Sequence, residues 1–199
     1  MNQLETFITG FAAAKFSIDT PWALTAQAKA HVELRLGRLG DGYIVKDDVA
    51  IHQSALVEKG CILKGPIVIG PQCFIGAHAY LRNGVWLDEN VGIGPGCEVK
   101  SSFIFNGTRL AHFNFVGDSV LGSNVNMEAG AVIANYFNER ADKSIFVRWN
   151  NGDLKLDTTK FGALVADGCR IGANAVLSPG TILPPNSIVS RLQLIDQRA

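Results

Sequence analysis

An aliphatic residue returns at every sixth position over most of this chain. The first members of the series are Val45, Ile51, Val57 and Leu63. The series continues to about residue 136 and resumes from Val165 to Val189. A fixed six-residue repeat is typical of a parallel β-helix, in which one hexad supplies a short strand with its turn and three hexads complete a triangular coil. Coils stack about 4.8 Å apart, so the repeated side chains form ladders inside. The pattern predicts an all-β domain over residues 44–199.

The first 43 residues lack the repeat and are expected to form a helical cap. A segment from Met1 to Phe16 carries one apolar helical face, formed by Leu4, Phe7, Ile8 and Phe11. Thr20 and Pro21 match the N-cap and first residue of a second helix, which ends near Gly37. We expect these helices to cover the open first coil, because a bare coil exposes an unpaired strand edge.

Two shortened steps in the repeat suggest where a functional site lies. The step from Val99 to Ile104 is five residues, and so is the step from Val116 to Leu121. Residues 110–115 lie between them. A sequence that breaks its own rule without structural gain favours a functional explanation.

The repeat stops altogether over an insertion at about residues 137–163. Within it, residues 144–149 and 154–157 flank the pair Asn151-Gly152, which is a hairpin signal. We expect a β-hairpin arm that projects from the solenoid. Its Lys143, Arg148 and Trp149 would cover a pocket or contact a neighbouring subunit, and a solvated insertion is the other interpretation.

Composition argues against several classes of partner. The 18 basic residues balance 18 acidic ones without a basic run, so binding to nucleic acid or anionic lipid is not expected. Apolar stretches are too short for a membrane span, and the N-terminal residues lack the charged start of a signal peptide.

The four cysteines act as small apolar fillers in this pattern. Each falls four residues after a ladder aliphatic, and they are Cys61, Cys73, Cys97 and Cys169. Their spacings do not match adjacent coils, and the chain has no C-x-x-C pair, so neither a disulfide nor a zinc site is indicated. We therefore expect a reducing, cytoplasmic setting.

The block from His112 to Tyr136, HFNFVGDSVLGSNVNMEAGAVIANY, resembles the C-terminal acetyltransferase domain of bifunctional sugar-1-phosphate nucleotidyltransferase/acetyltransferases. The archaeal members are the more similar, because they too place a long insertion after the Ala-Asn segment. The resemblance covers roughly residues 45–189. It implies a left-handed β-helix, an exception to the right-handed crossover rule. It also implies acetyl-CoA as acyl donor and a homotrimer with pockets between subunits, which would cover the outward aromatics Trp86, Phe103 and Phe113.

The resemblance gives roles to individual residues at the reaction centre. His112 takes the position of the general base, a role that suits an imidazole that must deprotonate a sugar ammonium. Asn135 takes the position of an amide that either orients the amine or stabilises the developing oxyanion. Tyr136 matches an aromatic residue beside the substrate.

Other matched positions concern binding. Arg82 and Lys100 stand where the family holds the sugar phosphate, although both would also be ordinary as exposed basic residues. Asn126 stands where the family binds the amino sugar, and a turn role is the alternative. Ala129 and Ala173 match positions near the thioester cofactor.

Departures from the family pattern affect substrate identity. Phe115 stands where the family usually has tyrosine, so a hydroxyl contact to the sugar is missing. Glu128 replaces a small residue, where it would hold the substrate ammonium or narrow the acyl pocket. A nucleotidyltransferase domain does not precede residue 45, so uridylyl transfer is not expected.

A γ-class carbonic anhydrase is the main metal-dependent alternative. Such an enzyme needs histidines that converge on a metal, but His52, His78 and His112 occupy three different places in their hexads. No metal is therefore expected. The sequence predicts an acyl-CoA-dependent transferase acting on a phosphorylated or nucleotide-linked sugar, and the alternative is a non-catalytic sugar-nucleotide sensor or assembly subunit.

Overall fold

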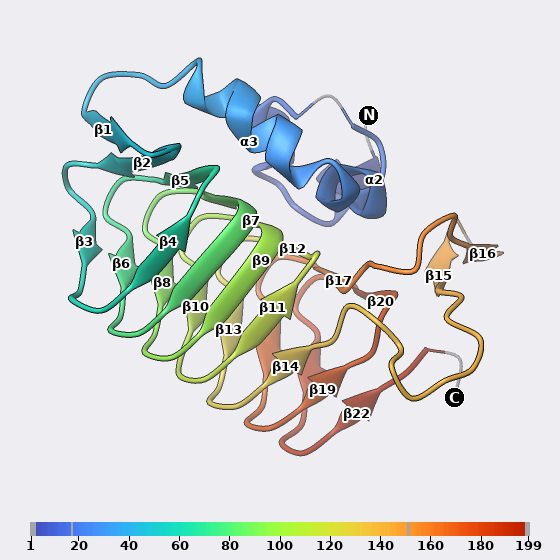
Figure 1. The fold of residues 1–199 in the computed structure, drawn as a ribbon. Coiled ribbons are helices and arrows are strands. Elements are labelled where there is room, and N and C mark those ends of the chain that lie inside the picture. The colour runs from blue at the N-terminus through green and yellow to red at the C-terminus, as the bar shows by residue number, and fades with distance from the viewer. Residues whose placement is uncertain (1–2, 17, 151, 198–199) are drawn as a thin grey trace.

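A computed structural model describes residues 3–16, 18–150 and 152–197. It confirms the predicted parallel β-solenoid, whose stacked triangular coils run from β2 (Val49–His52) to β22 (Leu194–Ile195) (Figure 1). The strand before them, β1 (Tyr43–Lys46), is antiparallel to β2, and Val45 is 55% exposed there, so the expectation that Val45 begins the buried ladder is wrong. The left-handed winding stays a prediction. None of the helices in the described residues is long and apolar enough to cross a membrane, and the longest has nine residues.

Each coil contributes one short strand to each of three faces. The helix-covered face consists of β2 (Val49–His52), β5 (Ile67–Ile69), the C-terminal halves of β7 (Tyr80–Leu87) and β9 (Glu98–Ile104), β12 (Val120–Leu121), β17 (Ala163–Val165) and β20 (Thr181–Leu183). The seven-stranded face consists of β3 (Leu56–Val57), β6 (Phe74–Ile75), β8 (Gly92–Ile93), β10 (Arg109–Leu110), β13 (Asn126–Met127), β18 (Arg170–Ile171) and β21 (Ile188–Val189). The third face consists of β4 (Ile62–Lys64), the N-terminal halves of β7 and β9, β11 (Phe115–Gly117), β14 (Val132–Ile133), β19 (Val176–Leu177) and β22.

The aliphatic ladders pair in register from coil to coil. On the third face, Leu81 pairs with Val99, Val99 with Val116, and Val116 with Ile133, all in parallel strands. These side chains form one continuous core. Three of the four cysteines are buried in it and all four are free, which confirms their reading as apolar fillers.

The N-terminal segment forms four short helices. They are η1 (Gln3–Thr6), α1 (Phe11–Ala14), α2 (Pro21–Ala26) and α3 (Ala28–Leu36). The predicted second helix begins after Thr20 and ends at Gly37 as expected, although the Thr20 side chain makes no capping hydrogen bond. It is not one helix, because Gln27 leaves the helical conformation and divides it into α2 and α3. The first predicted helix is divided near Thr9, whose amide and hydroxyl both donate to Asp167 Oδ2 at 2.9 and 2.8 Å. Met1 and Asn2 lie outside the described residues.

The expected position of these helices over the first coil is wrong. They lie along the helix-covered face, where α3 packs across β5, β7 and β9 (Figure 1). Trp86 and Phe103 point outward from that face and are 5% and 0% exposed, so the chain's own helices cover them. The edge of the first coil is paired instead by β1, which runs antiparallel to β2.

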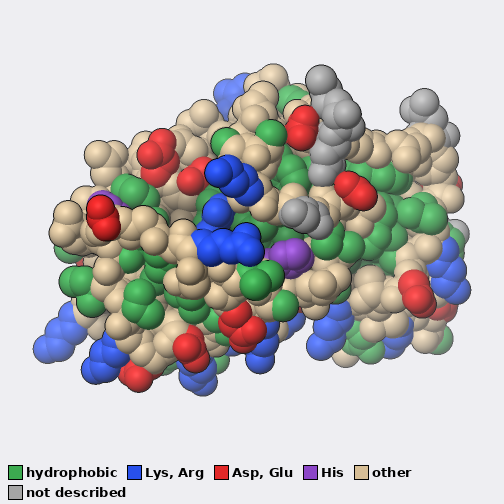
Figure 2. All heavy atoms as spheres, turned by 90° about the horizontal axis from the view of Figure 1, so that it is seen from above, with side chains coloured by type: hydrophobic (Ala, Val, Ile, Leu, Met, Phe, Trp, Pro, Cys, Tyr) green, Lys and Arg blue, Asp and Glu red, His purple; other side chains and the backbone are tan. Residues whose placement is uncertain are grey.

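A glycine allows this close packing. Gly84 has a φ of +88°, and a Cβ atom there would lie 2.6 Å from backbone atoms of Ala28 and Lys29 at the start of α3. The outer side of the helices is polar: seen from above, Lys and Arg side chains gather near its middle beside a histidine (Figure 2). A cavity of about 210 Å³ on this side is lined in part by Lys15, His31, Arg35 and Arg38.

The insertion contains the predicted hairpin. It consists of β15 (Phe146–Trp149) and β16 (Gly152–Lys155), paired antiparallel, and Asn150 adopts a φ of +51° at the turn. Asn151 lies outside the described residues. The hairpin packs on the chain's own N-terminal segment, because the Trp149 ring stacks on Phe7 at 5.7 Å and meets Trp22 edge-on at 5.2 Å.

Candidate active site

Two corners of the coil carry most of the predicted site residues. We call the turn between the seven-stranded face and the third face the His112 corner. There the amide of Gly130 donates to the carbonyl of His112 at 2.9 Å, and the amide of Asn174 donates to the carbonyl of Ala129 at 3.0 Å. His112, Ala129 and Ala173 therefore occupy equivalent places on three successive coils.

The His112 side chain is exposed at this corner and makes no hydrogen bond or ion pair with a described residue. Its backbone is firmly held. Asn114 is 2% exposed and its amide nitrogen donates to the carbonyls of Glu128 at 2.8 Å and Ala131 at 3.1 Å. A loop held by Asn114 thus presents an exposed imidazole at this corner.

The second corner, between the third face and the helix-covered face, we call the Asp118 corner. The Lys100 ammonium lies 2.6 Å from Asp118 Oδ2, and the two side chains are 13% and 9% exposed. The Asn135 amide nitrogen donates to the same Asp118 oxygen. Lys100 and Asn135 are therefore brought together by a carboxylate that the sequence interpretation missed.

The shortened hexad steps belong to the Asp118 corner. Val99 to Ile104 and Val116 to Leu121 both cross from the third face to the helix-covered face. The expectation that they mark the segment containing His112 is thus wrong, because that segment turns at the other corner. Asp118 could have been found from its spacing. It follows Ser101 by 17 residues and precedes Asn135 by 17 residues, and this spacing stacks the three residues on successive coils.

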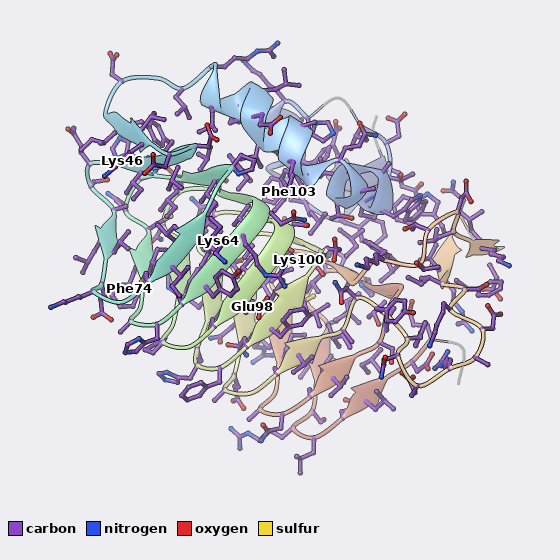
Figure 3. The ribbon with its side chains drawn as sticks, in the orientation of Figure 1. Lys46, Lys64, Phe74, Glu98, Lys100 and Phe103 are labelled. Carbon is purple, nitrogen blue, oxygen red and sulfur yellow. The ribbon has the colours of Figure 1, made fainter. Side chains whose placement is uncertain are left out.

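Arg82 and Lys100 lie in one register column of the third face. The Arg82 guanidinium donates to Glu98 Oε1 from Nε at 2.9 Å and from Nη2 at 2.7 Å. Figure 3 shows Glu98 and Lys100, both from β9, on the same face as Lys64 of β4. Both predicted phosphate ligands therefore have a carboxylate partner within the chain.

Gly117, on the next coil of the third face, pairs with Lys100. Because Gly117 has no side chain, Phe115 and Asn135 both lie close to its backbone. A Cβ atom at Gly117 would lie 2.8 Å from Asn135 Nδ2 and 2.9 Å from Phe115 Cε1. Tyr136 is 37% exposed, and the Lys143 ammonium lies 5.2 Å from its ring centre. Phe115, Asn135 and Tyr136 thus lie beside the Asp118 corner.

Asn126 lies apart from these residues, on the seven-stranded face. It lines a cavity of about 560 Å³ together with Glu128, Arg170 and Arg191. Arg191 donates to both carboxylate oxygens of Glu128, at 2.8 and 2.9 Å, and the amide of Ala173 donates to one of them. These bonds, those from Arg191 first, lower the pKa of Glu128 to about 2. Glu128 is therefore engaged within the chain and is a poor candidate for holding a substrate ammonium.

One chain thus separates the predicted residues into three groups: the His112 corner, the Asp118 corner with the third face, and the seven-stranded face. The described residues contain no cluster of three His, Cys, Asp or Glu side chains that would hold a metal ion. Proton transfer and hydrogen bonding are the chemistry that these side chains offer.

The hexad ladders and stacked coils define this chain as a hexapeptide-repeat β-solenoid. No protein-family model matches it. It is 34% identical over 163 residues to the bifunctional sugar-1-phosphate nucleotidylyltransferase/acetyltransferase of Sulfurisphaera tokodaii, which covers 78% of this chain and 40% of that protein. It is 29% identical over 159 residues to the bifunctional protein GlmU of Methanococcus vannielii, with 77% and 38% covered.

The chain is also 32% identical over 158 residues to the bifunctional protein GlmU of a Janthinobacterium species, of which it covers 33%. It therefore spans about two fifths or less of these relatives. The resemblance predicted from the His112 to Tyr136 block is confirmed. Among solved structures, a mutant GDP-perosamine N-acetyl transferase from Caulobacter crescentus in complex with CoA and GDP-perosamine is 16% identical. That match covers 83% of this chain and 63% of that one at a TM-score of 0.27, which is too low to carry an argument.

Proposed function

We propose that this chain is an acyl-CoA-dependent transferase that acetylates an amine, or a hydroxyl, of a phosphorylated or nucleotide-linked sugar. The observation that carries the proposal is the similarity to sugar-1-phosphate acetyltransferases, together with an exposed His112 in the matching position. Acetyl-CoA is the proposed donor, near Ala129 and Ala173. We also place the protein in the cytoplasm, in line with its four free thiols.

The proposed reaction needs one base and one thioester. His112 takes a proton from the acceptor ammonium, and the free amine attacks the thioester carbonyl carbon. A carbon–nitrogen bond forms and the carbon–sulfur bond breaks. The nitrogen loses a second proton as the amide forms, and the departing CoA thiolate takes up a proton to become the free thiol. Asn135 assists through its amide, while Arg82 and Lys100 bind the acceptor phosphate and Asn126, Phe115 and Tyr136 contact the sugar.

We further propose that the active unit is a homotrimer. His112 and Asn135 lie at different corners of one chain, so a neighbouring copy is needed to bring such groups to one acceptor. The His112 corner supports an interface there, because Phe113 is 72% and Leu192 is 78% exposed. Trp86 and Phe103 no longer support this assembly, since helices of the same chain cover them.

The test is thiol release from acetyl-CoA across a panel of amino-sugar phosphates and UDP-amino sugars. With the best acceptor, His112→Ala should lower kcat by about 10² to 10⁴, the usual loss when a general base is removed. The matched control is His78→Asn, because His78 is an exposed histidine at the same corner two coils earlier and its φ of +61° suits asparagine.

Three outcomes would contradict the proposal or its assignment of His112. Activity of His112→Ala within a few-fold of the parent would reject His112 as the base. Binding of a UDP-sugar by the parent without thiol release from any acceptor would favour the non-catalytic sensor. A joint fall in melting temperature and oligomer mass would assign His112 a structural role.

A further inference from the structure

The Asp118 backbone is fixed on both sides. Its φ of +47° lies in the left-handed region, its amide donates to the carbonyl of Lys100 at 2.9 Å, and its carbonyl accepts from the amide of Gly162 at 2.9 Å. The residue itself is 7% exposed. A non-glycine residue in this conformation costs energy, so the surrounding contacts must hold it there.

The Asp118 carboxylate selects one orientation of the Asn135 amide. An ionised carboxylate only accepts hydrogen bonds, so the amide nitrogen of Asn135 must face it and the carbonyl oxygen must face elsewhere. That carbonyl oxygen accepts no hydrogen bond from a described residue. It is therefore the free hydrogen-bonding end of the side chain.

Charge at this corner favours an amine over an oxyanion as the group that Asn135 meets. An oxyanion close to the remaining N–H of Asn135 would also approach the Asp118 carboxylate and be repelled. An amine hydrogen is attracted to the carbonyl oxygen, whose electron density the adjacent charged hydrogen bond increases. Lys100 offsets part of the Asp118 charge at 2.6 Å but does not change which end of the amide is free.

The insertion holds Asn135 from the other side. Where the chain returns from the insertion, the backbone amide of Phe161 donates to the backbone carbonyl oxygen of Asn135 at 3.2 Å. The next residue, Gly162, lies so close to the corner that a Cβ atom would be 2.2 Å from the carbonyl oxygen of Gly117. Asn135 thus has both its backbone and its side chain anchored.

We propose that Asp118 is a positioning residue of the transferase. It holds the Asn135 amide with the carbonyl oxygen free to accept a hydrogen bond from the attacking amine, and it holds Lys100 in the same network. This inference rests on the proposed function. It assigns Asn135 to orienting the acceptor amine and not to stabilising the oxyanion.

The variants for the test respect the backbone conformation. Asp118→Gly removes the carboxylate and tolerates the left-handed φ, and Asp118→Asn keeps the shape but loses the charge. The control is Ser101→Gly, because Ser101 has a φ of +48°, is 2% exposed and holds the equivalent place one coil earlier. Melting temperature and oligomer mass are measured for each.

Kinetics of amine acetylation then separate a positioning role from a structural one. Asp118→Gly should lower kcat by about 10²-fold, as expected when a catalytic group loses its alignment, while Ser101→Gly stays near the parent. In an Asn135→Ala background the same substitution should cost less than about threefold in kcat, because the group being positioned is already gone. If Asp118→Gly lowered kcat by the same factor in the Asn135→Ala background as in the parent, the inference would be overturned.

A second readout does not depend on turnover. The side-chain amide NMR signals of Asn135, assigned by their loss in Asn135→Ala, should shift in Asp118→Gly and stay unchanged in Ser101→Gly. Unchanged signals in Asp118→Gly would overturn the inference while leaving the proposed function intact. A parent that transfers acetyl to no acceptor would overturn the proposed function and the catalytic part of this inference, whatever the signals show.

Discussion

At the scale of single residues, the site is defined by pairs that the linear sequence hides. Arg82 and Lys100 stand out as cations, but their partners Glu98 and Asp118 are 16 and 18 residues further along. Only the stacking of coils places such residues within hydrogen-bond distance. The phosphate that we propose to bind here would therefore compete with, or add to, two existing ion pairs. Because these side chains are partly buried, their ion pairs contribute more than fully exposed pairs would.

The Glu128–Arg191 pair gives a residue-scale prediction about pH. Arg191 and the Ala173 amide lower the pKa of Glu128 from its ordinary 4.5 to about 2. Because the pKa is lower in the folded chain, the pair stabilises the fold above the ordinary carboxyl pKa, and this contribution is lost as the pH falls towards 2. Titration of Glu128 by carboxyl NMR should find a value near 2.

The matched variant for this titration is Arg191→Gln, in which the Glu128 pKa should return most of the way towards 4.5. A parent Glu128 that already titrates near 4.5 would show that the two side chains do not pair in solution.

At the scale of elements, the sequence predicted the strands well, because the inward side chain of each hexad must be apolar and the residue four positions later must be small. Thr20, Pro21 and Gly37 likewise predicted the bounds of the second helical segment from local chemistry alone. The position of the helices could not be predicted that way. It depends on outward residues such as Trp86 and Phe103, which sequence alone cannot assign to a helix of the same chain or to another subunit.

The return of the chain from the insertion gives an element-scale prediction. Gly162→Ala should lower the free energy of unfolding by about 2–3 kcal/mol, because the added methyl meets backbone oxygen of Gly117 and cannot be accommodated by a side-chain rotation. Thermal unfolding measures this loss. Gly40→Ala is the control, because a Cβ atom there meets no atom within 4 Å. Equal melting temperatures for the two variants would contradict the described packing at the corner.

At the scale of the whole molecule, the repeat predicted the solenoid, and the His112 to Tyr136 block predicted its relatives. It did not predict that one chain would leave His112 and Asn135 at separate corners. That separation follows from the triangular coil. Successive hexads of one coil end at different corners, so two residues in different hexads can lie at different corners even when they are close in the sequence.

The assembly prediction belongs to this scale. Light scattering on the purified chain should give three times the chain mass of 21.4 kDa at micromolar concentration. Phe113→Asp should reduce that mass, since it places a charge on an exposed ring at the proposed interface. A monomeric parent would contradict the trimer and, with it, the proposal that a neighbouring copy completes the site.

The helices along one side of the solenoid also limit how the subunits of such a trimer can be oriented. A closed three-fold ring is built from head-to-tail contacts, so each subunit needs two different surfaces that meet. Helices with a polar outer side occupy one of the three faces and leave the seven-stranded face and the third face for those contacts. In the proposed trimer the helical side would then form the outer rim, away from the symmetry axis.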